Sequence, residues 1–220
     1  DQCIGDTNSI GAIFRALRTI PAMRELARDM RELCPNALLL NYVNPMATVC
    51  RALDDEGVRF VGLCHGVQTT IRLIAGYLGR RVEDIDYICA GINHMGWFIK
   101  LEQDGRDLYP ELRRRTLEDK EVNESDIVRN EVFLALGYYV TESSGHNSEY
   151  NQWFRKRPDL IEKYCTHGTG WNPGHYAYSL EGRKERRKNP MKQYDDWMKS
   201  EFSAKKSQEY AADIFNARIG

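Results

Sequence analysis

The 220-residue sequence lacks the features that define several large classes of protein. Lys and Arg (31) nearly balance Asp and Glu (32), so a net charge of −1 gives no reason to expect a nucleic-acid or membrane partner. The most basic segment, residues 183–188, is offset by Asp195, Asp196 and Glu201, and it predicts a solvated helix face. No apolar run approaches the roughly 20 residues that span a bilayer, and no signal-peptide pattern is present at the amino end. We therefore expect a globular, cytoplasmic protein.

Cysteine and glycine motifs are also missing. The six cysteines show no Cys-x-x-Cys spacing, which disfavours a disulfide scaffold in a chain of this length. We expect free thiols, most of them buried, in a reducing compartment. No Gly-x-Gly-x-x-Gly sequence occurs, so the chain carries no dinucleotide-binding fingerprint of its own.

The first 90 residues alternate between helical and strand-like patterns. Apolar residues at helical spacing predict a long amphipathic helix over residues 11–34, which contains Pro21, a residue that can kink a helix. Shorter elements follow, with strands predicted over 37–43, 58–63 and 86–90 and helices over 46–53 and 67–78. This order predicts parallel crossovers covered on both faces. The fold class is therefore α/β, with the second half of a doubly wound, Rossmann-like sheet.

The sequence pattern changes after residue 94. Residues 97–109 predict a hairpin with an Asp104-Gly105 turn, and helices are predicted over 126–137, 149–164 and 191–217, with a loop over 167–178. We place a domain boundary near residue 97, which leaves a helix-rich α+β second domain. Because the chain has no initiator methionine and ends inside a helical pattern, we expect an internal fragment of a longer protein.

Cys64 and His94 each follow a predicted strand of the Rossmann-like sheet. The carboxyl ends of neighbouring strands are where such sheets bind ligands, and a thiolate with an imidazole makes half of a divalent-metal site. The plainer alternative is a cysteine that packs as a small hydrophobe and a histidine with an ordinary hydrogen bond. A metal site is favoured by the other polar side chains at strand ends, namely Asn41, Asn44, His65 and Asn93.

A second polar cluster lies at residues 138–150. Its run from Glu142 to Glu149 is typical of a helix start, with Ser or Asn as the capping residue and an acidic residue in the first turn. Capping does not explain the aromatic residues among 150–154, which can form the wall of a sugar pocket.

Six motifs together carry a resemblance to a known family. In order they are Gly5-Asp6-Thr7 and residues 13–21, 41–46, 61–65, 90–95 and 140–144. The chain resembles glycoside hydrolase family four over nearly its whole length, most closely the α-galactosidase (melibiase) branch. The resemblance implies a glycosidase with a small-molecule sugar substrate, bound NAD, Mn²⁺ or another divalent metal, and a homodimer or homotetramer. It also implies that residues 1–96 belong to the NAD-binding domain and residues 97–220 to a substrate and metal domain like the C-terminal domain of lactate and malate dehydrogenases.

The chemistry implied by the resemblance is an exception to the usual pair of carboxylates in glycosidases. NAD oxidises the sugar C3 hydroxyl, which makes the C2 proton acidic. A base then removes that proton, the C1–O bond eliminates, water adds and the ketone is reduced again. The metal polarises the C2 and C3 oxygens, which is Lewis-acid chemistry.

Metal and substrate residues follow from the same resemblance. Cys64 and His94 match the metal ligands of the family, and the sugar oxygens would complete the coordination shell. Asn44 matches a sugar-contacting asparagine, and Asn93 lies beside the metal histidine, so we expect both to bind substrate.

Catalytic residues are matched in the same way. His65 occupies the position where phospho-glucosidase branches carry an aspartate as general acid, and histidine can donate a proton near neutral pH. This exchange argues against a phosphorylated sugar. Tyr150 matches the tyrosine that removes the C2 proton, and Asp6 matches an acidic residue that raises the basicity of that tyrosine.

The sequence also departs from the family pattern. Residues 8–12 hold fewer glycines than the family segment after Asp-Thr, and the nucleotide-binding half is absent. We therefore expect no glycosidase activity from these 220 residues alone. Three alternatives stay open: an α-glucosidase or α-glucuronidase of the same family, a lactate/malate-type 2-hydroxyacid dehydrogenase, and a binding protein without catalysis.

Overall fold

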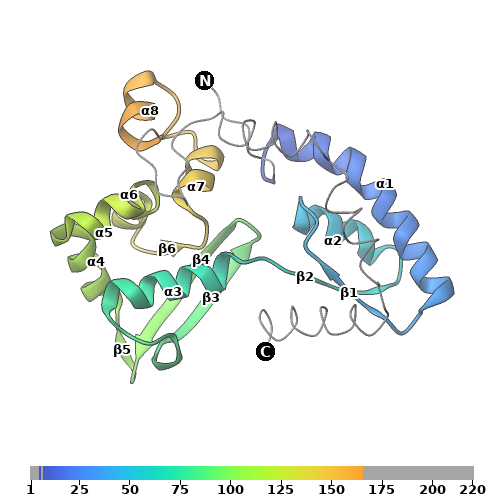
Figure 1. Cartoon of the computed structure of the whole chain (residues 1–220), viewed down its shortest axis with the longest axis horizontal. Helices are drawn as coiled ribbons and strands as arrows, with labels where there is room; N and C mark the ends of the chain where they lie inside the picture. The colour runs from blue at the N-terminus through green and yellow to red at the C-terminus, as the bar shows by residue number, and fades with distance from the viewer. Residues whose placement is uncertain (1–4, 6, 166–220) are drawn as a thin grey trace, which may run out of the picture. The chain divides into compact units, whose positions relative to one another are not determined.

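A computed structural model describes residue 5 and residues 7–165, all within one compact unit of the chain (Figure 1). The strands are β1 (Leu38–Asn41), β2 (Arg59–Gly62), β3 (Asp86–Ile92), β4 (Met95–Gln103), β5 (Arg106–Asp107) and β6 (Tyr139–Val140). The helices are α1 (Ile10–Leu33), α2 (Met46–Asp54), α3 (Gly66–Leu78), α4 (Tyr109–Glu118), α5 (Lys120–Ser125), α6 (Ile127–Leu136), α7 (Ser144–Tyr150) and α8 (Pro158–Cys165), with a 3-10 turn η1 at Val82–Asp84.

The first region is a parallel strand–helix–strand unit, as predicted. β1 and β2 pair from Leu38↔Arg59 to Asn41↔Gly62, and α1 and α2 pack together beside them (Figure 1). A Cβ at Gly62 would come within 2.8 Å of Cys50 Sγ, so the missing side chain lets α2 approach β2 closely. The parallel pairing brings the carboxyl ends of both strands to the same edge.

The third predicted strand departs from the expected topology. β3 pairs antiparallel with β4, from Asp86↔Glu102 to Ile92↔Met95, and lies in a different sheet from β1 and β2. A two-residue turn brings residues 95–103 directly back onto β3, and closing so short a loop costs far less entropy than returning to a distant parallel sheet. Gly91 has φ +132, and a Cβ there would overlap the Met95 carbonyl oxygen. The expected extension of the parallel sheet was wrong, whereas the hairpin at Asp104-Gly105 is confirmed.

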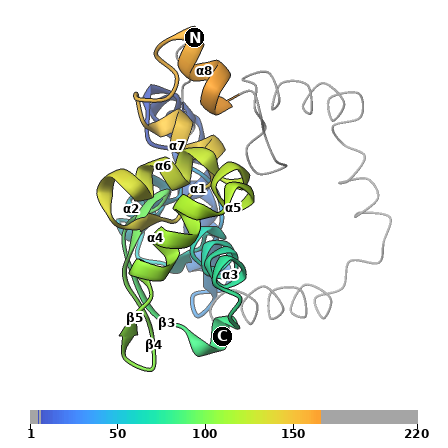
Figure 2. The same ribbon diagram turned by 90° about the vertical axis from the view of Figure 1, so that its left-hand side faces the viewer.

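The larger core lies between α3, α4 and the antiparallel sheet. Figure 1 shows α3 lying across β3 and β4, and Figure 2 shows α4 beside α3. Ile74, Phe98 and Leu112 are fully buried where these elements meet. Tyr139 on β6 is also fully buried, and its hydroxyl donates to Asn130 Oδ1 at 2.9 Å. This core gives the site a rigid base, because close packing resists displacement of its elements.

The helices of the second region differ in part from the prediction. The helix expected over 126–137 is confirmed as α6, whereas the largely helical stretch expected over 149–164 is interrupted, with residues 151–157 outside any helix. α7 ends at Tyr150 and α8 begins at Pro158, since the residue before a proline avoids helical geometry and proline suits a first helical turn. The features expected within residues 167–217, the basic segment 183–188 included, lie outside the described residues.

The described cysteines are free, but most are not buried. Cys165 is buried, three others are half-buried, and Cys34 is exposed, so the expectation of mostly buried thiols was wrong. None of the helices in residues 7–165 has the length and apolarity that a membrane-spanning segment requires.

Candidate active site

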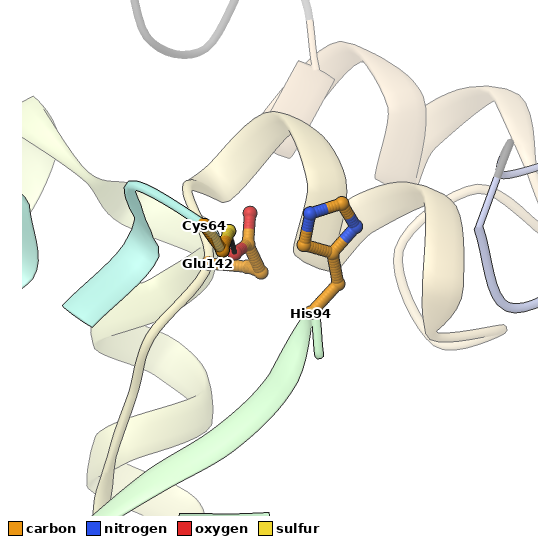
Figure 3. Close-up of side chains that lie close together, drawn as sticks. All are labelled: Cys64, His94 and Glu142. Carbon is orange, nitrogen blue, oxygen red and sulfur yellow. Dashed lines mark hydrogen bonds between the residues drawn. The ribbon is translucent and has the colours of Figure 1, made fainter. Parts of the chain in front are cut away.

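Three segments that are distant in the sequence bring a thiol, an imidazole and a carboxylate together. Cys64 follows β2, His94 lies in the turn between β3 and β4, and Glu142 follows β6. The ligand atoms of these side chains all lie within 4.8 Å of one another, and the side chains point toward a common centre (Figure 3). The structure thus brings Cys64 and His94 together through two different sheets, and it adds a third donor.

The half-buried Cys64 thiol is held by polar groups on several sides. The Gly66 amide donates to its Sγ at 3.4 Å, the Asn93 side chain hydrogen-bonds it, and the thiol lies 4.0 Å from Glu142 Oε1. Burial raises the pKa of the Cys64 thiol, the Gly66 hydrogen bond lowers it, and the Glu142 carboxylate raises it again. A nearby positive charge, such as that of a metal ion, would favour the thiolate form.

His94 has an unusual backbone conformation. Its φ is +67, in the left-handed region that non-glycine residues rarely adopt, and the residue is buried. Such a conformation costs roughly 1–3 kcal/mol and persists only where the surroundings enforce it. Here the β3–β4 pairing on both sides fixes the turn, so the fold holds the imidazole at the cluster.

Tyr150 belongs to a stack of three rings beside the cluster. The His94, His146 and Tyr150 rings lie nearly parallel, with centroids 5.4–6.0 Å apart. The Tyr150 hydroxyl is 3.2 Å from His94 Nδ1, and His146 Nδ1 is 2.9 Å from Glu149 Oε2. A Cβ at Gly5 would overlap the Tyr150 ring, so the glycine backbone closes the stack on its other side. These contacts fix the phenol next to a candidate metal ligand.

A buried polar network holds the segment that carries Glu142. Arg129 donates to Thr70 Oγ1 at 3.1 Å and lies 3.3 Å from Asp126 Oδ2. Thr70 Oγ1 donates to the Thr141 carbonyl at 2.6 Å, while the Ser144 amide donates to Asp126 Oδ1 at 3.0 Å. These contacts tie α3, α6 and the start of α7 to one another.

A cavity of about 650 Å³ opens at the cluster. Its volume suits a small ligand such as a sugar. It is lined by Cys64, His65, Gly66, Thr69, Thr70, Arg72, Leu73, His94, Ser125, Asp126, Arg129, Thr141, Glu142, Ser143 and His146.

The other predicted residues differ in how they relate to the cavity. His65 lines it at the N-terminus of α3, with its ring 5.4 Å from that of Tyr42. Asn93 contacts Cys64, and its Oδ1 is buried without a hydrogen-bond partner among the described residues. Asn44, which precedes a cis peptide bond to Pro45, is not among the lining residues. Asp6 lies outside the described residues.

Glu142 and His146 have no individual role in the sequence-based predictions. Both lie in the polar run interpreted as a helix start, and that interpretation is correct for Ser143, whose Oγ accepts from the His146 amide. The position of Glu142 two residues after the end of β6 is the local feature that could have pointed to a site.

The fold and the cluster define an α/β protein in which half of a Rossmann-like sheet precedes a helix-rich α+β domain and a candidate metal site lies beside a cavity. The model of the family 4 glycosyl hydrolases matches residues 1–80, and the model of the C-terminal domain of that family matches residues 89–220. The chain belongs to glycosyl hydrolase family 4.

Curated relatives include two α-galactosidases. The α-galactosidase of Bacillus subtilis (strain 168) is 48% identical over 165 residues, which cover 74% of this chain and 38% of the relative. The α-galactosidase of Rhizobium meliloti (strain 1021) is 41% identical over 189 residues, which cover 83% of this chain and 39% of the relative. The chain therefore spans about two fifths of the length of these relatives.

Solved structures give the same fold. The putative glucosidase lplD from Bacillus subtilis superposes with a TM-score of 0.67 at 26% identity, over 85% of this chain and 47% of that chain. A 6-phospho-alpha-glucosidase from gut microorganisms was solved in complex with NAD and Mn²⁺. It superposes with a TM-score of 0.61 at 23% identity, over 82% of this chain and 42% of that chain.

Proposed function

We propose that this chain is part of an α-galactosidase that requires NAD and a divalent metal ion. The observation that carries the proposal is the convergence of Cys64 and His94 at a cavity, with the Tyr150 hydroxyl 3.2 Å from His94 Nδ1. The two α-galactosidase relatives support the choice of sugar.

Cys64 and His94 would hold the metal ion. Thiolate and imidazole are both good ligands for divalent transition metals, and the buried carboxylate nearby adds to the negative charge that attracts a cation. When bound, NAD would accept hydride from the sugar C3 and the metal ion would polarise the C2 and C3 oxygens, which together make the C2 proton acidic. The described residues include no glycine-rich phosphate loop, so we assign no residue of this chain to NAD.

Tyr150 and His65 would move the protons. Tyr150 would take the C2 proton on its phenolic oxygen; the contacts of its ring with Gly5 and His146 and of its hydroxyl with His94 support this role. His65 lines the cavity and would donate a proton to the leaving glycosidic oxygen.

The polar lining favours a neutral sugar. The guanidinium of the buried Arg129 is already paired with Asp126, so its charge is offset before any ligand binds. Asn93, which contacts Cys64, and Asn44 are retained as proposed substrate contacts, although neither is among the residues that line the cavity.

Turnover of nitrophenyl α-galactoside by the intact protein, with NAD and Mn²⁺ present, tests the proposal. In D₂O the released galactose should carry deuterium at C2, because removal and return of the C2 proton exchange it with solvent. Nitrophenyl α-glucoside and α-glucuronide distinguish the other family specificities. Hydrolysis without NAD or metal, or galactose without deuterium, would contradict the proposal, and manganese-independent oxidation of a 2-hydroxy acid would favour a dehydrogenase.

A further inference from the structure

We propose that Glu142 is a third protein ligand of the divalent ion at Cys64 and His94, and that its carboxylate gives the site a preference for manganese over softer metals. The proposal rests on the proposed function only in assuming that a metal ion binds at Cys64 and His94.

The geometry places Glu142 within reach of a shared ion. Its Oε1 is 4.0 Å from Cys64 Sγ, and all three ligand atoms lie within 4.8 Å of one another (Figure 3). Metal–ligand bonds of roughly 2.0–2.3 Å leave the ligand atoms of one ion up to about 4.6 Å apart. Small torsional changes in the three side chains are therefore enough to bring them to one ion.

The charges at the cluster also call for a cation. Glu142 is only 7% exposed, and within residues 7–165 no Lys or Arg side chain forms an ion pair with its carboxylate. Arg129, which lines the same cavity, is paired with Asp126. A buried charge without a partner is costly, and a thiolate beside the carboxylate would add repulsion. One divalent ion would balance the charge of the Glu142 carboxylate together with that of a Cys64 thiolate.

The fold holds the Glu142 carboxylate in its place. The Asn147 side-chain amide donates to the Glu142 carbonyl, and the Thr141 amide donates to the Gly96 carbonyl at 2.9 Å. A Cβ at Gly66 would lie 2.6 Å from Glu142 Oε1, so a side chain there would displace the carboxylate from its present position at the start of α3. The carboxylate is therefore seated by contacts on both its backbone and its side chain.

A carboxylate changes which metals a thiol–imidazole pair prefers. Thiolate favours soft or borderline ions such as zinc, whereas carboxylate oxygen favours manganese and magnesium. A site with all three ligands would retain the thiolate bond and gain an oxygen ligand suited to Mn²⁺. Removing the carboxylate charge should then weaken Mn²⁺ binding more than Zn²⁺ binding.

The test is direct metal binding by the intact protein and four variants. Loss of the free Mn²⁺ signal in electron paramagnetic resonance gives the Mn²⁺ affinity, competition gives the Zn²⁺ affinity, and the thiolate absorption band of bound Co²⁺ reports the Cys64 bond. Glu142→Gln should lower Mn²⁺ affinity at least ~10-fold, lower Zn²⁺ affinity less, and keep the Co²⁺ band. Glu118→Gln, at an exposed carboxylate on α4, is the matched control and should bind all three metals normally.

Gly66→Ala provides a second variant in which the carboxylate is retained but displaced. It should also weaken Mn²⁺ binding, and it keeps the proposal testable if Glu142→Gln fails to fold. Unchanged Mn²⁺ affinity in both variants, with loss of binding in Cys64→Ser, would overturn the role of Glu142 and leave the proposed function standing. Unchanged Mn²⁺ affinity in Cys64→Ser as well would overturn the metal site itself.

Discussion

The region before Cys64 and the region after it contribute differently to the site. Residues 10–63 form a parallel unit whose core cluster holds three buried residues, Ala27, Val49 and Leu53, while Phe14 and Leu17 on α1 are more than 60% exposed. Residues 66–165 contain a core cluster of thirteen buried residues around α3 and β4. The second region thus buries far more apolar surface, and burial is the main source of stability.

The site draws on both regions but unequally. The well-packed second region supplies His94, Glu142 and Tyr150. Cys64 is held at the end of the first region, where it follows β2. We infer that the second region fixes the positions of the His94, Glu142 and Tyr150 side chains. The first region positions only the Cys64 thiol, through the short strand β2.

The largest expected effect is that of Cys64→Ser on catalysis. Replacing the thiol removes the metal ligand of the first region, so metal-dependent turnover should be lost while the unfolding transition is nearly unchanged. Turnover and thermal unfolding of the intact protein measure the two quantities. Cys34→Ser, at an exposed cysteine of the same region, is the control and should retain activity. Activity retained by Cys64→Ser would show that the first region supplies no metal ligand.

A leucine-to-alanine pair compares the two cores directly. Leu112 on α4 and Leu53 on α2 are both fully buried. Such substitutions cost about 2–5 kcal/mol, and the cost rises where the surroundings cannot collapse into the cavity. Leu112→Ala should fall near the upper end of that range and Leu53→Ala near the lower end, as measured by urea unfolding. Equal losses would mean that the small core packs as rigidly as the large one.

The two regions also differ in how well the sequence predicts them. The helix and strand positions of the first region were predicted to within a few residues, because hydrophobic periodicity is a local property. The sheet to which β3 belongs was not predicted correctly, since strand pairing depends on a partner elsewhere in the chain. The apolar pattern of residues 86–90 is compatible with a parallel and with an antiparallel sheet, so it does not show that β3 pairs antiparallel with β4.

The site, like the fold, was predicted from the sequence only in part. Cys64 and His94 were found from their positions after strands and from family motifs, and the structure brings them together. Glu142 was not found, because its local sequence is explained by the Ser143 cap and only tertiary structure places its carboxylate at Cys64. The resemblance matched Tyr150 to the base, but its stack with His94 and His146 follows from the turn geometry of His94.

Gly5→Ala should lower catalysis through Tyr150. A methyl group at Gly5 would overlap the Tyr150 ring and push the phenol away from His94. A displacement near 1 Å can cost on the order of 100-fold in rate, so we expect kcat to fall about 10- to 100-fold with little change in thermal stability. Gly76→Ala, where a Cβ meets nothing within 4 Å, is the control and should leave kcat unchanged. A normal kcat in Gly5→Ala would mean that the ring stack does not position a catalytic group.

The smallest expected effect concerns ion pairs in the two regions. In the second region Arg80 binds both Glu111 oxygens, at 2.6 and 3.0 Å, and this hydrogen-bonded guanidinium holds the pKa of Glu111 below its usual value. A carboxyl with a lowered folded-state pKa contributes stability above its unfolded-state pKa, and that contribution is lost as pH falls through the folded-state pKa. Both side chains are partly exposed, so solvent screening limits the contribution to about 0.5–1 kcal/mol.

Glu111→Gln should therefore destabilise the protein near neutral pH, and the difference from the wild type should shrink as the solution is acidified below the usual range of a glutamate. Urea unfolding at several pH values measures this difference. The more exposed Arg51–Asp55 pair of the first region is the comparison, and Asp55→Asn should have a smaller effect at every pH. An equal effect of the two substitutions would mean that the exposure of an ion pair does not set its contribution to stability. A Glu111→Gln effect that persists at acid pH would show that the lost contribution is packing of the side chain and not its charge.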